Sequence, residues 1–338
     1  MHIPDGYLGP QTYIALDAAI VPIWAVAAVK VKKTLKAKQV PLMALGAAFS
    51  FVIMMFNVPL AGGTTGHAVG ATLIAILLGP WAACISVSIA LVIQALIFGD
   101  GGITALGANV INMAVIMPFV GYYLYRLVAG RAPSRVRRVV AAGVGSYVGI
   151  VAAAIAAGFE LGLQPLIAHS ASGQPLYAPY PLGVAVGAMA VGHALVFGPL
   201  EAAITMGAVG VLGRQDSALL EMQPASKPIT WLWAALGMGI LLTPIGMLAQ
   251  GTAWGEWSGA ELQARLGFVP AGMAGLGGVW TAAMPGYAPA FIRNPFAGYV
   301  VAGVVGVVLI VGLTWGVAKL LAGGESDDTP AAPSAPAS

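Results

Sequence analysis

Long apolar runs separated by short polar segments dominate the chain. The runs cover residues 12–29, 40–58, 66–98, 103–125, 139–159, 182–212, 230–249 and 298–322. Most have the length of about 20 residues that crosses a bilayer as one helix. The run 66–98 is too long, since its 33 residues would form a helix about 50 Å long. We therefore predict that Gly79-Pro80 divides it into two helices.

The composition sets the class of protein. Hydrophobic residues make up 59% of the chain and charged residues only 8%, which is typical of an all-α polytopic membrane protein. The single cysteine, Cys84, lies inside an apolar run, which excludes an intrachain disulfide and a cysteine metal cluster.

The basic residues predict how the helices are oriented. If the run 66–98 forms two helices and the amino terminus is outside, 13 of the 15 Lys and Arg residues fall in cytoplasmic segments, as the positive-inside rule requires. This arrangement predicts seven helices up to about residue 213, two more after it, and a cytoplasmic carboxyl terminus. The 13 residues are Lys30, Lys32, Lys33, Lys36, Lys38, Arg126, Arg131, Arg135, Arg137, Arg138, Arg214, Lys227 and Lys319, which leaves Arg265 and Arg293 outside.

The first half of the divided run is short. A helix from His67 to Leu78 has about 12 residues and would be about 18 Å long, too short to cross unaided. We expect residues 59–66 to form a re-entrant loop from the external side, tolerated at depth only where protein or a cavity surrounds it. His67 is then expected at a helix start below the outer surface.

The first six residues, Met1-His2-Ile3-Pro4-Asp5-Gly6, form a candidate chelate. The Met1 amine, the deprotonated His2 amide and the His2 imidazole can close two fused rings on one metal ion, and His67 can supply a fourth nitrogen. Four nitrogens in a plane suit Ni(II) or Cu(II), with Co(II) as a further candidate, and suit Zn(II) poorly. Residues 1–11 lack the regions of a signal peptide, and large His2 should keep Met1 in place, so we expect a free amine.

Alternative interpretations of these residues stay open. Met1-His2 alone is also explained by a start codon that happens to precede a histidine codon. Pro4 favours an extended Ile3 and Gly6 permits a sharp turn, so the sequence favours an N-terminal hook of defined shape. Asp5 is either a carboxylate that offsets the charge of the bound ion or a cap of the Gly6 turn.

Several polar residues lie inside the predicted spans and should face the bundle interior, because they are costly in lipid. His193 and Glu201 share one helix face, where interhelical packing is favoured over a role in translocation. His169 and Glu160 are expected in an external loop, 160–181. The other polar residues at membrane depth are Asp17, Gln94, Asn109 and Asn112.

Four stretches carry a resemblance to a known family. They are residues 1–6, Phe56-Asn57-Val58-Pro59 with Gly62-Gly63-Thr64-Thr65-Gly66-His67, Gly99 to Asn109, and Met117 to Tyr123. Together they resemble the CbiM/NikM family, the substrate-capture (S) components of energy-coupling factor (ECF) transporters for nickel and cobalt. The resemblance covers about residues 1–213. It implies a seven-helix S component whose terminal amine, second-residue amide and imidazole, and a histidine matching His67, coordinate the ion.

The C-terminal part resembles, more weakly, the small two-helix accessory subunit of these systems. We expect a metal-binding membrane domain (1–213), a cytoplasmic linker (214–229), a two-helix segment (230–322) with an external loop (250–297), and a disordered tail (323–338). Ser258 to Glu261 has the spacing of a capping box and predicts a short helix to about Leu266. The segment either stabilises the complex or helps to load the metal. Trp254, Trp257, Trp280 and Tyr287 are predicted interfacial anchors.

Two motifs that the sequence lacks argue against two classes of enzyme, ATPases and metalloproteases. The chain has no G-x-x-x-x-G-K-[ST] loop, so it is not expected to hydrolyse ATP, and no H-E-x-x-H motif of a metalloprotease. The resemblance implies a transmembrane coupling (T) subunit and ATPase (A) subunits as partners in the cytoplasmic (inner) membrane. Ni(II) or Co(II) is then a transported substrate, with no organic cofactor and no nucleic acid involved. The choice between the two ions stays open, and a self-sufficient secondary transporter or channel is the alternative.

Overall fold

Helices form almost all of the regular structure in the computed structural model, which describes residues 1–60, 64–249, 251 and 253–321. Within these residues, eight helical segments are long and apolar enough to cross a membrane. The predicted all-α polytopic fold class is therefore confirmed. In chain order the α-helices are α1 (Pro10–Thr34), α2 (Val40–Met54), α3 (Ala71–Leu78), α4 (Pro80–Ile93), α5 (Leu106–Val110), α6 (Met117–Ala129), α7 (Arg135–Ile167), α8 (Leu182–Gly192), α9 (Gly198–Gln215), α10 (Thr230–Leu242), α11 (Gly259–Leu266), α12 (Ala271–Leu276) and α13 (Pro295–Leu321).

Short helical turns join several of these helices. The π-helical turns η2 (Gln94–Phe98), η3 (Ile111–Ile116) and η4 (His193–Phe197) extend α4, link α5 to α6 and link α8 to α9. Each carries a polar residue that is buried: Gln94, Asn112 and His193. The remaining turns are η1 (Ala37–Gln39), η5 (Ser217–Glu221), η6 (Thr243–Leu248) and η7 (Pro285–Tyr287).

The long apolar run is divided where the sequence predicts. α3 ends at Leu78, α4 begins at Pro80, and Gly79 between them has a φ of 88°, which favours glycine. The helix start differs from the prediction, because α3 begins at Ala71 and His67 lies four residues before it. The Glu201 carboxylate accepts hydrogen bonds from the Val69 and Gly70 amides, which keeps these residues out of the helix.

A small antiparallel hairpin lies in the predicted re-entrant loop. β1 (Val58–Leu60) pairs with β2 (Thr64–Gly66), and residues 61–63 between them lie outside the described part of the chain. A Cβ atom on Gly66 would lie 2.2 Å from the Phe197 ring, so only glycine fits there. The hairpin thus leads directly to His67, with its end packed on the turn between α8 and α9.

Helix α7 is longer than predicted. The apolar run suggests an end near residue 159, but the helix continues to Ile167, so Glu160 lies in a helix and not in an external loop. The Asn112 side chain donates a hydrogen bond to Glu160 at 2.7 Å. Gln164 is also buried and accepts from the Gly9 amide at 2.9 Å, so polar partners inside the bundle hold this last part of the helix.

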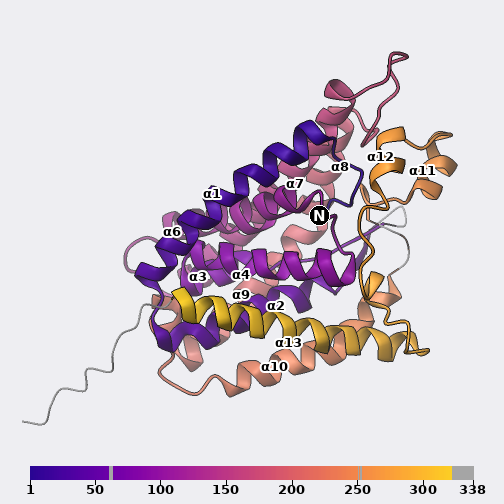
Figure 1. The fold of residues 1–338 in the computed structure, drawn as a ribbon. Helices are drawn as coiled ribbons and strands as arrows, with labels where there is room; N and C mark the ends of the chain where they lie inside the picture. The colour runs from indigo at the N-terminus through magenta and orange to yellow at the C-terminus, as the bar shows by residue number, and fades with distance from the viewer. Residues whose placement is uncertain (61–63, 250, 252, 322–338) are drawn as a thin grey trace, which may run out of the picture.

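The C-terminal helices pack along one side of the bundle. α13 lies against α2, with α10 beside both (Figure 1). Gly306 allows the close approach, since a Cβ atom there would lie 2.1 Å from the Phe51 ring. The Tyr299 hydroxyl donates to the Met55 carbonyl at 2.9 Å and joins the two helices near their ends.

The loop between η6 and α13 folds over the end of the bundle that holds the amino terminus (Figure 1). Its helix α11 has the predicted capping box, in which Ser258 and Glu261 exchange hydrogen bonds. Tyr287 is only 7% exposed and stacks on Phe98, so its prediction as an interfacial anchor is wrong. The predicted disordered tail, 323–338, lies outside the described residues.

Candidate metal centre

Residues 1–9 form a hook that enters the end of the bundle before α1 begins. Met1 is 5% exposed, His2 3% and Ile3 1%, although they are the first residues of the chain. The side chain of Asn109 on α5 forms hydrogen bonds with both backbone groups of Ile3, as a neighbouring β-strand would. Its Oδ1 accepts from the Ile3 amide at 2.8 Å, and its Nδ2 donates to the Ile3 carbonyl at 3.1 Å. The position of His2 is therefore fixed by the backbone of the next residue.

The glycine-rich segment, residues 99–102, follows η2 and makes room for this hook. A Cβ atom on Gly102 would lie 2.3 Å from the Asp5 amide nitrogen, and one on Gly101 would lie 2.9 Å from Asn109 Nδ2. The Gly102 amide donates to the Ile3 carbonyl at 2.8 Å. Asp5 accepts from the Thr104 amide at 2.8 Å and from its hydroxyl at 2.6 Å, so in this structure its carboxylate fixes the hook to the glycine-rich segment.

The hook brings His2 to His67. Nδ1 of His2 lies 3.1 Å from Nε2 of His67, and both side chains are buried. Two nitrogens at neighbouring corners of a square plane, each about 2.0–2.1 Å from the metal, are separated by about 2.9 Å. The two imidazoles are therefore separated by nearly the distance that one shared ion requires. Nδ1 is also the His2 nitrogen that can close a chelate ring with its own amide.

Asp100 contacts the same imidazole. Its Oδ1 lies 3.1 Å from His2 Nδ1, and its Oδ2 accepts from the Tyr287 hydroxyl at 2.5 Å and from Gln94 Nε2 at 3.2 Å. Asp100 was not among the residues predicted for the site, although it lies in the Gly99 to Asn109 motif. Its position between glycines, in Gly99-Asp100-Gly101-Gly102, was the available signal.

A second carboxylate meets the terminal amine. The Met1 nitrogen lies 3.6 Å from Oε1 of Glu256, which comes from the loop between η6 and α11. No sequence pattern pointed to Glu256. The candidate nitrogens are therefore accompanied by two carboxylates, Asp100 beside His2 and Glu256 beside the amine.

Two family models match successive parts of the chain. Residues 2–219 match the model of CbiM, the cobalt uptake substrate-specific transmembrane region. The chain belongs to the CbiM family. Residues 229–323 match a second model, the PDGLE domain. The resemblance predicted from the sequence motifs is confirmed.

Curated relatives of this CbiM-family chain extend over both parts. It is 48% identical over 330 residues to the fused nickel transport protein NikMN of Rhodobacter capsulatus, covering 92% of this chain and 95% of the relative. It is 49% identical over 269 residues to the probable fused nickel transport protein LarMN of Lactiplantibacillus plantarum, covering 79% and 80%. The match to fused proteins supports the expected C-terminal fusion. The chain is a multi-pass membrane protein whose relatives are named for transport, with nickel or cobalt as substrate.

A solved structure has the same fold. The crystal structure of a truncated transition metal transporter is 56% identical, with a TM-score of 0.59, and covers 66% of this chain and 100% of that one. A second transition metal transporter is 57% identical, with a TM-score of 0.60, and covers 63% and 93%.

The electrostatics of the CbiM-family site favour neutral imidazoles. Burial, and then the charge of the amino terminus, lower the pKa of His2 to about 3, although the Gln94 side chain acts in the opposite direction. A neutral imidazole is the form that binds a metal. Burial is also the main reason why the pKa of Glu256 is raised to about 7, with the negative Asp100 adding to it and the amine opposing it.

Coordination through His2 Nδ1 places the ring hydrogen on Nε2. In the described part of the chain, this Nε2 and the Oε1 of Gln94 are both buried and make no hydrogen bond. Gln94 lies close enough to the imidazole to raise its pKa. Gln94 Oε1 is therefore an acceptor available to the metal-bound form of the ring.

The other polar candidates lie outside this cluster. His193 donates through Nδ1 to the Met189 carbonyl at 2.8 Å, within its own helix, and Glu201 binds the backbone before α3. His169 is exposed beside Ser170. Among the described residues, no group of three or more His, Cys, Asp and Glu side chains is arranged to hold a metal. The described His, Cys, Asp and Glu side chains alone therefore provide no metal site.

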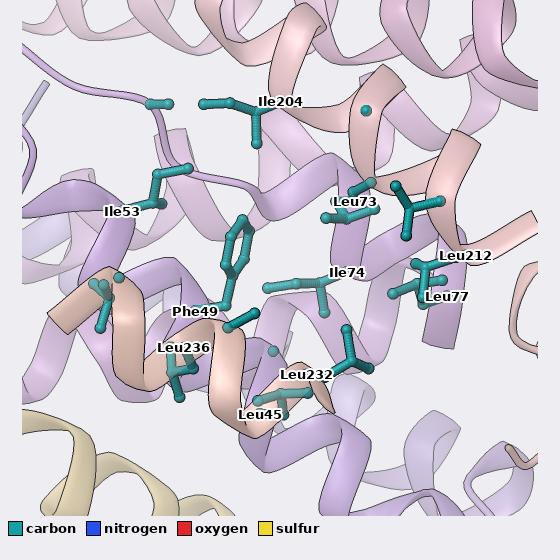
Figure 2. Close-up of a pocket in the computed structure, with 18 of the residues that line it drawn as sticks. Leu45, Phe49, Ile53, Leu73, Ile74, Leu77, Ile204, Leu212, Leu232 and Leu236 are labelled. Atoms are coloured by element: carbon teal, nitrogen blue, oxygen red, sulfur yellow. The ribbon is translucent and has the colours of Figure 1, made fainter. Parts of the chain in front are cut away.

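A separate cavity of about 620 Å³ lies between α2, α3, α9 and α10. Figure 2 shows that only carbon atoms of the labelled side chains point into it, among them Phe49, Ile74 and Leu236. No side chain that lines it ligates metals. The cavity is therefore no candidate for the metal site.

Proposed function

We propose that this protein captures Ni(II) or Co(II) at the external face of the cytoplasmic membrane, as the substrate-specific subunit of an ATP-driven ECF transporter. Membership of the CbiM family and the names of the nickel transport relatives support this proposal. The sequence has no phosphate-binding loop, which supports ATP hydrolysis by separate ATPase subunits. The resemblance adds a transmembrane coupling subunit as the third component.

The ion is held by four nitrogens: the Met1 amine, the His2 amide, His2 Nδ1 and His67 Nε2. The observation that carries this proposal is the 3.1 Å separation of the two imidazole nitrogens, produced by a hook that also buries the amine. The amine, the amide and Nδ1 of His2 occupy three consecutive corners of a square. His67 completes it, opposite the amide.

The charges of the surrounding groups suit a divalent ion. The amine carries a proton in its ion pair with Glu256, and Asp100 lies beside the neutral imidazole. When the ion binds, the amine and the amide each lose one proton. Two positive charges enter and two leave, so the net charge of the buried site is unchanged. A single divalent ion exchanged for two protons avoids the cost of adding charge to a dry site.

Nickel is the preferred ion in this proposal. Four nitrogen donors in a plane stabilise a d8 ion, whereas Zn(II) has no such preference and adopts a tetrahedron. The preference therefore rests on the donor set, in which the amine, the amide and Nδ1 of His2 form two fused rings that favour one plane.

The amino terminus is proposed to lie outside and the carboxyl terminus in the cytoplasm. Segments rich in Lys and Arg meet at the end of the bundle away from the hook, where Gln39 donates to the Met222 carbonyl and Arg138 pairs with Glu221. The positive-inside rule places this end in the cytoplasm. We further propose division into a metal-binding domain (1–213), a linker (214–229) and a two-helix accessory segment from residue 230.

Displacement of the amine tests the site. Insertion of one alanine between Met1 and His2 breaks the fused rings, and acetylation removes the amine as a ligand. We expect either change to abolish high-affinity nickel binding in calorimetry. Insertion of one alanine after Gly173, in an exposed turn, is the control and should leave binding unchanged. High-affinity binding by the acetylated protein would refute the four-nitrogen site.

A further inference from the structure

The C-terminal segment, residues 230–321, reaches the amino-terminal hook at several points. The Tyr7 hydroxyl donates to the Trp257 carbonyl at 2.7 Å. Gly6, with a φ of 86°, lies so close to α12 that a Cβ atom would lie 2.8 Å from the Met273 carbonyl oxygen. These contacts are to the backbone, so they depend on the fold of the segment and not on one side chain.

Two side chains of the segment reach further, to groups beside the nitrogen ligands. Glu256 lies 3.6 Å from the Met1 amine, and Tyr287 donates at 2.5 Å to the carboxylate of Asp100. Asp100 in turn contacts His2 Nδ1 at 3.1 Å. The segment therefore contacts the chelate at both ends, at the amine directly and at the imidazole through Asp100.

Tyr287 is held in a way that favours this contact. It has a φ of 61°, a left-handed conformation that is rare for a residue with a side chain. Its ring stacks on Phe98 at 4.8 Å, and its hydroxyl also accepts from Gln94 Nε2 at 3.1 Å. Such backbone strain persists where the surroundings fix the residue. The aromatic contacts and the two hydrogen bonds fix the tyrosine against the bundle.

We propose that Glu256 and Tyr287 are positioning residues of the metal site, so that the C-terminal segment holds the amino-terminal hook in the binding geometry. In the metal-free protein Glu256 holds the amine at its corner of the square, and Tyr287 holds Asp100 against Nδ1 of the His2 imidazole, so that the hook is in place before the ion arrives. Neither residue is a ligand. The segment slows release of the ion by keeping the hook in place. This inference rests on the proposed four-nitrogen site.

Hydrogen–deuterium exchange of residues 2–9 in the metal-free full-length protein tests the contact without the ion. Glu256→Gln and Tyr287→Phe keep the side-chain shape and remove one charge and one hydroxyl. We expect the amides of the hook to exchange about twofold to fivefold faster in Glu256→Gln, which loses a partly exposed ion pair, and at least about tenfold faster in Tyr287→Phe, which loses a hydrogen bond to a carboxylate. Equal exchange in the variants and the wild type would overturn the proposal.

Two matched controls remove similar groups elsewhere. Glu221→Gln removes the carboxylate that pairs with Arg138 at the other end of the bundle. Tyr299→Phe removes a buried hydroxyl that bonds to Met55. Both should exchange like the wild type.

Nickel measurements separate positioning from coordination. We expect nickel to dissociate about twofold to fivefold faster from Glu256→Gln and at least about tenfold faster from Tyr287→Phe. The d–d absorption band should stay at its wild-type wavelength in both, because the four nitrogens are unchanged. A shifted band in Glu256→Gln would show that the Glu256 carboxylate binds the ion and would overturn the positioning role. If the wild type binds no nickel, the proposed function fails, while the exchange experiment still decides whether the segment holds the hook.

Discussion

The His2 imidazole is uncharged because the hook is docked. Burial first, and the nearby amine second, lower its pKa from 6.5 to about 3. In an undocked hook, the imidazole would titrate near its ordinary value. Protons therefore favour the undocked hook between these two values, and docking is fully stable only above about pH 6.5.

The pH dependence of nickel affinity follows from this difference. Below about pH 6.5, each unit of acidification should weaken hook docking about tenfold. Above it, affinity should keep rising with pH, because the ion still displaces protons from the amine and the amide. Calorimetry in buffers of different ionisation enthalpy should report about two protons released per ion at pH 7.5. An affinity that does not vary between pH 5 and pH 8 would contradict both the chelate and the docked neutral imidazole.

Loss of one imidazole should weaken the site without unfolding the protein. His67→Ala removes one of four ligands and leaves the hook bound to Asn109, so we expect nickel affinity to fall about tenfold or more. Titration calorimetry measures the change. His169→Ala, at an exposed histidine, is the control and should bind like the wild type. Unchanged affinity in His67→Ala would mean that another group is the fourth ligand.

Residues of the site differ in how far the sequence could predict them. Met1 and His2 could be proposed because adjacent groups form chelate rings whatever the fold. His67 could be proposed because the re-entrant loop before it places it below the outer surface, within reach of an external hook. Asp100 and Glu256 could not be found in this way, since neither is adjacent to the chelate in sequence; Glu256 reaches Met1 from a distant part of the chain, and no local pattern marks it.

At the scale of helices, glycine and proline were the reliable signals. Gly79-Pro80 ends one helix and begins the next, because proline fits the first turn of a helix and positive φ favours glycine. The ends of α3 and α7 were predicted less well. At both ends, polar groups from distant helices decide the boundary: Glu201 for the start of α3, and Asn112 for the part of α7 around Glu160.

The segment that carries His67 depends on Glu201. This carboxylate accepts from the Val69 amide at 2.8 Å and from the Gly70 amide at 3.0 Å. Glu201→Ala leaves both buried amides without their acceptor, at a cost of about 1–3 kcal/mol each. We expect the thermal transition to fall and nickel affinity to drop several-fold although no ligand is lost. Glu201→Gln keeps one acceptor oxygen, so its thermal transition and its nickel affinity should lie between those of the wild type and of Glu201→Ala. Equal nickel affinity in all three proteins would show that His67 is placed without Glu201.

On the scale of the whole molecule, binding and release need different states of one hook. The hook is enclosed by α5, by the glycine-rich segment and by the C-terminal segment, all at one end of the bundle (Figure 1). In the proposed topology that end is external. An ion bound there must leave at the other face, so the hook has to be displaced or the whole bundle has to be reoriented.

The energy for that step is proposed to come from outside the chain. A site with nanomolar affinity holds its ion by about 12 kcal/mol. The chain has no phosphate-binding loop, and we see no internal repeat of the kind that secondary transporters use for alternating access. Without a source of energy, a site of such high affinity would retain nickel and not release it on the other side of the membrane.

Proteoliposomes distinguish capture from transport. The isolated chain should bind external nickel at about one ion per protein and accumulate none inside, with or without a proton gradient. Addition of the coupling and ATPase subunits with internal ATP should produce accumulation that stops when ATP is replaced by a non-hydrolysable analogue. The His67→Ala variant in the complete complex is the control, because it keeps the ATPases and weakens only capture. Nickel accumulation by the isolated chain, driven by a proton gradient, would instead identify a secondary transporter, since no partner would then be needed to empty the site.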